Sequence, residues 1–238
     1  MMWLELDSDE LTRGRLMPSV LLCVDPSLLQ GAGSLDAVGH RFDDCAPSLQ
    51  AALSALSSEP LAPEARADLQ RCFEALPAGG RIVHIGFMVT RHPTVLKLFA
   101  AMDKEQVLGY LDAIRWPGSL AEAASLIDTF GAGPDTFRVD LTIGAGLLPR
   151  LGLEFASRRG ADPERRALID RCVEQGLCTP EKREALLSWS GSTREVIPGY
   201  ARPVRLSRWL DLKIVHRPPE PREAKAYLGF MFHFSLLG

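Results

Sequence analysis

The chain of 238 residues is long enough for one large domain or two small ones and for a sizeable core. Its 46% hydrophobic and 24% charged residues are typical of globular proteins and exclude disordered, collagen-like and coiled-coil chains. A formal net charge of -3 provides no overall attraction to nucleic acid or to an anionic membrane, so we expect neither as a partner.

The N-terminal region predicts two strands followed by two helices. Apolar and polar residues alternate in Trp3–Asp7 and Ser19–Asp25, as in half-buried strands. Apolar spacing of three to four residues predicts helices over Cys45–Leu56 and Pro63–Leu76. Pro77 and the glycines that follow it end the second helix.

The same order of elements recurs twice further along the chain. A hairpin over Arg81–Ala101 turns near Pro93, and helices over Lys104–Trp116 and Leu120–Phe130 follow it. The next hairpin covers Thr136–Ser157, where the glycines of the GAG sequence at 144–146 supply the permissive backbone of a turn. The helices predicted after this hairpin cover Pro163–Gln175 and Glu181–Trp189.

A final hairpin is predicted over Trp209–Phe234, with Pro218, Pro219 and Pro221 in its turn. The sequence therefore predicts a single α+β domain, in which ββαα units repeat three times before a last ββ pair. The units cover roughly residues 1–78, 79–132, 133–190 and 191–238. We expect them to form an antiparallel sheet or barrel with the helices on the outside.

The five cysteines are odd in number and contain no CxxC pair, which favours reduced, buried thiols. The spacing of Cys172 and Cys178 fits neither a zinc knuckle nor a redox pair, so no metal site is expected. The N-terminal residues carry acids early and lack the apolar stretch of a secretory signal, and no later stretch is long enough for a membrane span. These features predict a soluble, cytoplasmic protein without membrane contact.

The alternation gives each predicted strand an apolar face, which should meet the helices, and a polar face. The apolar faces contain Phe137, Val139, Leu141 and Ile143; Leu151, Leu153 and Phe155; Leu210, Leu212 and Ile214; and Ala226, Leu228 and Phe230. The polar faces contain Arg138, Asp140 and Thr142; Arg150, Gly152 and Glu154; Asp211 and Lys213; Lys225, Tyr227 and Gly229; and, towards the N-terminus, Trp3, Glu5, His84, Gly86, Met88, Lys97 and Phe99.

Two arrangements are compatible with these faces: an open sheet with a solvated polar face, or a barrel with a polar interior. The aromatic residues Trp3, Phe99 and Tyr227 on the polar face favour a ligand site. The second arrangement, with strand and helix pairs around a polar, aromatic-lined lumen, resembles the αββα barrel of the ABBA aromatic prenyltransferases. The resemblance is one of layout: fewer strands are predicted than that family has, and no family motif is matched.

The resemblance implies transfer of a prenyl group from an allylic diphosphate to an aromatic or peptide acceptor. Such a reaction needs cations around the diphosphate, aromatic faces near the allylic carbocation and a carboxylate that accepts a proton. The residues predicted to bind the diphosphate are Arg138, Arg150, Lys213, Lys225 and Tyr227. On an open sheet, the same cations would form cross-strand pairs with Asp140, Glu154 and Asp211.

Glu154 and Glu5 are the candidate proton acceptors, because each places a carboxylate on the polar face. The alternative for Glu154 is an ion pair with Arg138 across the hairpin. His84, Lys97 and Asp211 are further candidates for the lumen. No cofactor is evident from the sequence, and a requirement for Mg²⁺ stays open, as does the oligomeric state.

The hypotheses for function therefore belong to different classes. The first is a prenyltransferase-like enzyme, and the alternative is a non-catalytic binding or scaffold protein of a biosynthetic pathway that holds a peptide or small molecule. A third is another enzyme class on an unfamiliar α+β repeat. The motifs of P-loop NTPases, dinucleotide-binding dehydrogenases, zincins and GxSxG hydrolases are absent from the sequence, which neither supports nor excludes this third hypothesis.

Overall fold

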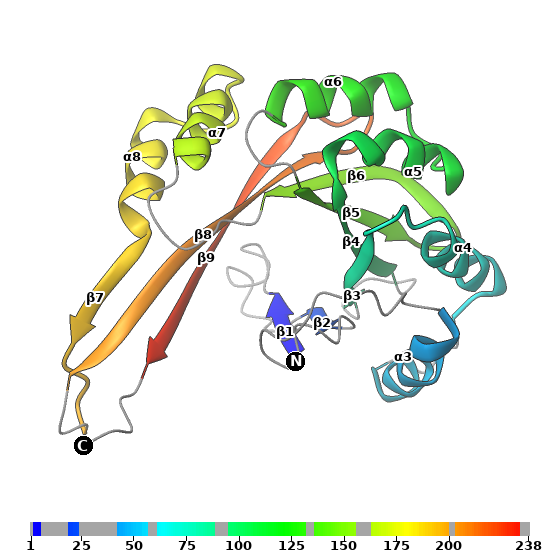
Figure 1. The fold of residues 1–238 in the computed structure, drawn as a ribbon, viewed down its shortest axis with the longest axis horizontal. Coiled ribbons are helices and arrows are strands. Elements are labelled where there is room, and N and C mark those ends of the chain that lie inside the picture. Colours follow the sequence, from blue (N-terminus) through cyan, green and yellow to red (C-terminus); the bar gives the residue numbers. More distant parts are fainter. Residues whose placement is uncertain are drawn as a thin grey trace.

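The structure is a computed structural model that describes residues 2–5, 19–23, 42–56, 61–88, 95–131, 136–155, 163–199 and 203–233. In these ranges, nine strands form one antiparallel sheet, and helices pack against one of its faces (Figure 1). The α+β class and the antiparallel pairing predicted from the sequence are confirmed.

The strands are β1 (Met2–Glu5), β2 (Ser19–Cys23), β3 (Arg81–Met88), β4 (Val95–Asp103), β5 (Thr136–Ile143), β6 (Leu147–Phe155), β7 (Gly191–Glu195), β8 (Val204–His216) and β9 (Glu223–His233). The helices are α3 (Phe42–Leu56), α4 (Pro63–Glu74), α5 (Val107–Ala113), α6 (Leu120–Phe130), α7 (Pro163–Glu174) and α8 (Pro180–Trp189), with a 3-10 turn η1 (Lys104–Gln106) before α5.

The last part of the chain contains one strand more than the sequence predicts. β7 has the sequence GSTRE and is largely exposed, so it lacks the apolar alternation by which the other strands were recognised. It pairs with the first part of β8, which begins at Val204 rather than at the predicted Trp209. The expected final strand pair is therefore a three-stranded arrangement.

The sheet has the strand order β1-β2-β3-β4-β5-β6-β8, and β7 and β9 both pair with β8. β6 and β7 lie along one edge of β8, whereas β9 pairs along the other edge. β1, β7 and β9 each pair with a single strand and are therefore edge strands of the described sheet, and none of the described pairings joins β1 to β7 or to β9. Of the two predicted arrangements, the described strands form the open sheet and not the closed barrel, and the long β8–β9 ribbon runs outward from the body of the sheet (Figure 1).

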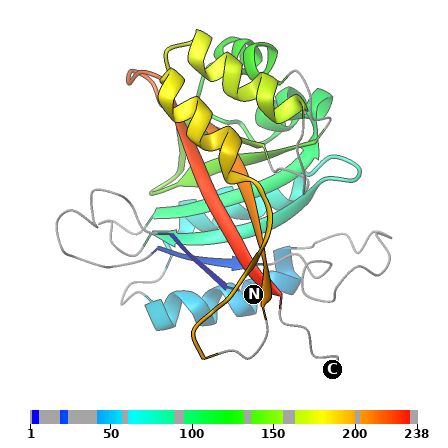
Figure 2. The same ribbon diagram turned by 90° about the vertical axis from the view of Figure 1, so that its left-hand side faces the viewer.

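The predicted apolar faces of β5, β6 and β8 form the centre of the core. Phe137, Val139, Leu141, Leu153 and Ile214 are fully buried, together with residues of the covering helices. β9 differs from this expectation, since Leu228 and Phe230 are exposed although they continue the same alternation. Figure 2 shows why: β9 begins beside α7 and α8 but continues past them towards the end of the ribbon.

Helices in the described part of the chain are all too short or too polar to cross a membrane.

Candidate functional site

Asp140, in the middle of β5, is the most deeply buried carboxylate among the described residues, with 0% exposure. Its neighbours in sequence, Val139 and Leu141, point into the core beneath the helices. Successive strand residues face opposite sides, so Asp140 projects from the face that carries no helix. The strand register places Phe99 of β4 and Gly152 of β6 on either side of it.

Three cations from three other strands converge on the Asp140 carboxylate. Lys213 Nζ of β8 and a guanidinium nitrogen of Arg150 from β6 each donate a hydrogen bond of 3.0 Å to Oδ2. Lys97 Nζ of β4 lies 3.4 Å from both oxygens. Both lysines are buried.

These cations decide the charge state of Asp140. Burial acts to raise the pKa of this carboxyl, but the positive charges of Lys213, Lys97 and Arg150 outweigh it. The pKa is therefore held far below its usual range. Asp140 is therefore ionised at neutral pH and serves as the counter-ion for the three cations.

Gly152 permits this convergence. A Cβ atom at this position would lie 2.9 Å from the Asp140 Cβ and 3.2 Å from the Lys213 Cδ. Any side chain here would displace the carboxylate or the lysine beside it. The glycine on the predicted polar face of β6 is thus required by close packing rather than by a turn.

Glu154 forms a second ion pair beside the first. Arg138 of β5 donates a hydrogen bond of 2.8 Å to Glu154 Oε1, and Lys213 Nζ lies 4.0 Å from Oε2. Burial raises the pKa of Glu154, and the charges of Lys213 and Arg138 only partly offset that effect. Glu154 is consequently a carboxylate that takes up a proton more readily than an exposed glutamate.

Two aromatic rings enclose the Lys213 ammonium group. Its Nζ lies 4.8 Å from the ring centroid of Phe99 and 5.0 Å from that of Tyr227. Burial acts to lower the pKa of Lys213, but Asp140, Tyr227 and Glu154 together raise it. Lys213 is therefore a permanent cation that bridges both carboxylates and contacts both rings.

We call Lys97, Arg138, Asp140, Arg150, Glu154 and Lys213 the Asp140 cluster. Among the described carboxylates, Asp211 also acts on it, because its charge raises the pKa of Glu154. Among the described residues, four cations and three carboxylates therefore meet in this region. The side chains of Arg138 and Arg150 are 28% and 12% exposed, so they form the accessible part of the cluster.

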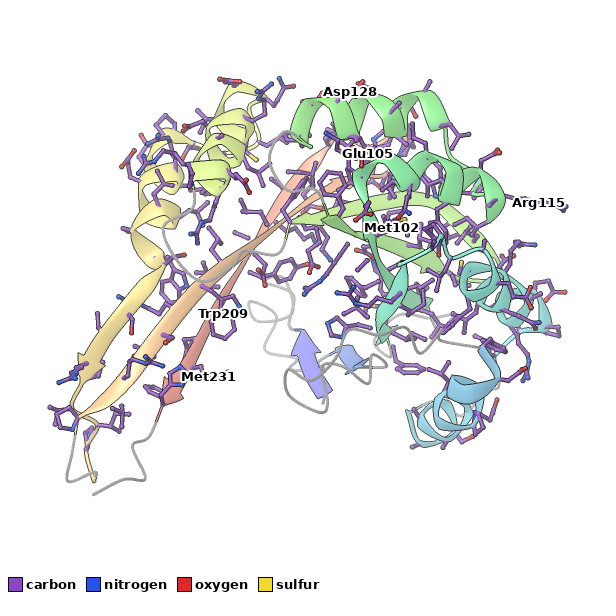
Figure 3. All side chains as sticks on the ribbon, viewed as in Figure 1. Met102, Glu105, Arg115, Asp128, Trp209 and Met231 are labelled. Carbon is purple, nitrogen blue, oxygen red and sulfur yellow. The ribbon has the colours of Figure 1, made fainter. Side chains whose placement is uncertain are left out.

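The cluster lies on the face of the sheet that carries no helix. Figure 3 shows side chains projecting into the space between the β8–β9 ribbon and strands β3 to β5. The solvated polar face predicted for an open sheet is wrong at this point, since Asp140, Thr142 and Lys213 are buried. The long side chains of Lys97, Arg150 and Lys213 reach from neighbouring strands to Asp140 and surround its carboxylate.

Of the residues predicted to bind a diphosphate, Arg138, Arg150, Lys213 and Tyr227 are brought together. Lys225 lies opposite Lys213 in the register, but its Nζ is 3.9 Å from Glu223 Oε1 and its side chain is 31% exposed. Lys97, predicted only as a further lumen residue, belongs to the cluster. The alternative predicted for Glu154, an ion pair with Arg138, is observed.

Three other residues predicted for the site are not members of the Asp140 cluster. His84 contacts Phe99, with ring centroids 6.1 Å apart. Asp211 of β8 lies opposite Tyr227 of β9. Glu5 pairs through its backbone with Ser19 in β1, whereas its side chain lies outside what the structure describes.

The central role of Asp140 was missed by the sequence interpretation, which treated this residue only as a surface ion-pair partner. A signal was present: the aspartate stands between Val139 and Leu141 inside a continuous strand, where a charged residue needs several partners. No group of three or more His, Cys, Asp or Glu side chains within the described ranges is placed to bind a metal ion.

Comparison of the chain with family models, with curated proteins and with solved structures finds no match. Function is therefore inferred from the geometry of the cluster alone.

Proposed function

We propose that the protein binds a small molecule that carries a diphosphate or a similar compact anion, and that the anion binds at the Asp140 cluster. The convergence of four cations at a largely buried site is the observation that carries this proposal. Arg138 and Arg150, the accessible members, offer planar donors that match phosphate oxygens.

The reaction proposed for this site is prenyl transfer to an aromatic or peptide acceptor. The bond between the allylic carbon and the diphosphate oxygen would break, and the diphosphate would leave with the electron pair towards the arginines. The acceptor would form the new bond to that carbon and release a proton to Glu154. The raised pKa of Glu154 supports this role, because a proton acceptor works best with a pKa near the working pH.

The finer layout belongs to the same proposal. Each pair of strands with the pair of helices that follows it is one unit of a common ββαα pattern, and the helices form the outer layer around the ligand. The protein acts in the cytoplasm, where the free thiols of Cys72, Cys172 and Cys178 would stay reduced.

A non-catalytic binding or scaffold protein is the second candidate, and the position of Lys213 favours it. The ammonium group lies over both Phe99 and Tyr227, the rings that would otherwise face a carbocation. With these faces occupied, the cluster would hold an anionic small molecule or peptide without performing transfer.

Thermal unfolding with and without inorganic diphosphate tests the binding that both candidates share. Ligand at about 100 times its dissociation constant should stabilise the protein by roughly 2.7 kcal/mol. Lys97→Met should reduce the shift, because it removes one cation but leaves Asp140 with Arg150 and Lys213. Lys225→Met is the matched control and should leave the shift unchanged.

Dimethylallyl diphosphate with a panel of aromatic and peptide acceptors then separates the candidates. Release of diphosphate that depends on the acceptor and is lost in Glu154→Gln supports transfer. Binding without any turnover supports the non-catalytic candidate. A cooperative unfolding transition that no diphosphate shifts contradicts both.

A further inference from the structure

The outer half of β9 carries apolar side chains that the helices do not cover. Leu228 is 50% exposed and Phe230 58%, and Met231 and Phe232 are exposed as well. Exposed apolar residues grouped on one strand are unusual for a monomer surface and mark an interaction site. Trp209 and Met231 mark this part of the ribbon in Figure 3.

The backbone of β9 offers a second feature. In the part of the chain that the structure describes, β9 pairs with β8 alone, so it forms one end of the sheet. A long strand at the end of a sheet is a template for pairing with another chain. β9 has eleven residues, which is long for a strand in this position.

We propose that β9 pairs antiparallel with β9 of a second copy of this chain, about a two-fold axis at Leu228. Leu228 is the middle residue of Glu223–His233, so this register is the one that pairs the whole strand with itself. It places Glu223 of each copy opposite His233 of the other. It also places the small side chains of Ala224 and Ala226 opposite Phe232 and Phe230.

A two-fold axis at either of the two neighbouring residues gives a less suitable pairing. An axis at Gly229 would set Lys225 opposite His233, and an axis at Tyr227 would leave Phe232 and His233 beyond the paired region. Antiparallel strands with a two-fold axis need self-complementary partners. Of these three registers, the Leu228 register sets the carboxylate of Glu223 opposite the imidazole of His233 and the small side chains opposite the large ones.

A cavity supplies an independent argument for the same occupant. About 280 Å³ of space lies between α7, α8 and the β8–β9 pair. Its lining is mainly apolar and includes Cys172, Leu177, Leu186, Leu212, Ala224 and Ala226. Phe230 and Phe232 of the second copy, facing Ala226 and Ala224, would project on this side of the sheet and fill the mouth of the cavity. Each copy thus offers both the aromatic side chains and the space that receives them.

The mass of the full chain in solution, measured by light scattering over a concentration series, is the first test. We expect a dimer that dissociates on dilution. Phe230→Ser should shift the equilibrium towards monomer without lowering the unfolding temperature of the monomer. Val196→Ser is the matched control, because Val196 is also an exposed apolar residue but directly follows β7, which pairs with the edge of β8 opposite to β9.

Cysteine cross-linking tests the register. In the proposed pairing, the two Cβ atoms at position 228 lie roughly 4.5–5.5 Å apart, so Leu228→Cys should form an intermolecular disulfide when oxidised glutathione takes up the two thiol hydrogens. Met231→Cys is the control. The two 231 positions are six residues apart along the paired strands, about 20 Å, and cannot be bridged.

Charge exchange provides a third readout. His233→Glu should weaken the dimer by placing two glutamates opposite each other, and the double variant Glu223→Lys with His233→Glu should restore it. A folded chain that stays monomeric throughout the series overturns the proposal. Equal cross-linking at positions 228 and 231, or a dimer that is insensitive to both Phe230→Ser and His233→Glu, also overturns it.

Discussion

β5 and β9 carry the same alternation of apolar and polar residues, yet their environments are opposite. On β5, the apolar face is fully buried under helices, and the other face holds Asp140 at 0% exposure. On β9, the corresponding apolar residues Leu228 and Phe230 face solvent, and Lys225 pairs only loosely with Glu223. Alternation therefore fixes which residues share a face, whereas the position of the strand in the sheet decides whether either face is buried.

Asp140→Asn should produce the largest effect, because it leaves Lys97, Lys213 and Arg150 without their central counter-ion. Breaking a buried ion pair by removing one partner costs about 3–5 kcal/mol of unfolding free energy. Chemical denaturation measures the loss. On β9, Lys225→Met should change the unfolding free energy by less than about 0.5 kcal/mol. Similar losses in the two variants would show that the cluster is solvated.

Truncation of a leucine on each strand compares the two apolar faces. Leu141→Ala should destabilise the chain by about 2–5 kcal/mol, because it leaves a cavity beneath the helices. Leu228→Ala, measured at a concentration where the protein is monomeric, should cost about 0.5 kcal/mol or less. A large loss for Leu228→Ala in the monomer would mean that this side chain is buried.

Glycine substitutions sharpen the comparison further. Gly152→Ala should cost about 1–3 kcal/mol, because its Cβ meets the Cβ of Asp140, which cannot move away from its three cations. Gly229→Ala on β9 would also meet a side chain, the Trp209 indole, but this ring is half-buried and can turn towards solvent. Equilibrium unfolding of both variants should show the smaller loss for Gly229→Ala, and the reverse order would contradict this reasoning.

The raised pKa of Glu154 predicts a pH dependence with a definite sign. The folded protein binds this proton more tightly than the unfolded chain, so ionisation of Glu154 lowers stability as pH rises from about 4.3 to the raised pKa. Glu154→Gln should remove this component and flatten the curve of unfolding free energy against pH in that window. The effect of Asp140 has the opposite sign: its lowered pKa stabilises the folded protein, and this contribution to stability is lost only below a pH of about 3.9. An unchanged slope in Glu154→Gln would refute the assignment.

The sequence predicts local features well where a local rule decides them. The GAG turn and the ion pair between Arg138 and Glu154 both follow from short-range patterns and are observed. The centre of the site does not follow in this way. Lys97, Arg150 and Lys213 reach Asp140 only because three strand registers and the curvature of the sheet bring them to one point.

The strand β7 and the exposed half of β9 are two further features that the sequence pattern did not predict. β7 is held by pairing with β8 rather than by any apolar pattern of its own. On β9, Ala226, Leu228 and Phe230 were predicted to meet helices, but α8 ends at Trp189 and leaves the outer ribbon uncovered. The length of a covering helix relative to the strand beneath it is a tertiary property that alternation does not contain.

Calorimetric titration of the protein with inorganic diphosphate tests the proposed anion site most directly. The four cations of the Asp140 cluster predict saturable binding of one diphosphate per chain, weakened in Lys97→Met and unchanged in Lys225→Met. Absence of binding by the folded wild-type protein would contradict the proposed site, as would equal affinities in the two lysine variants.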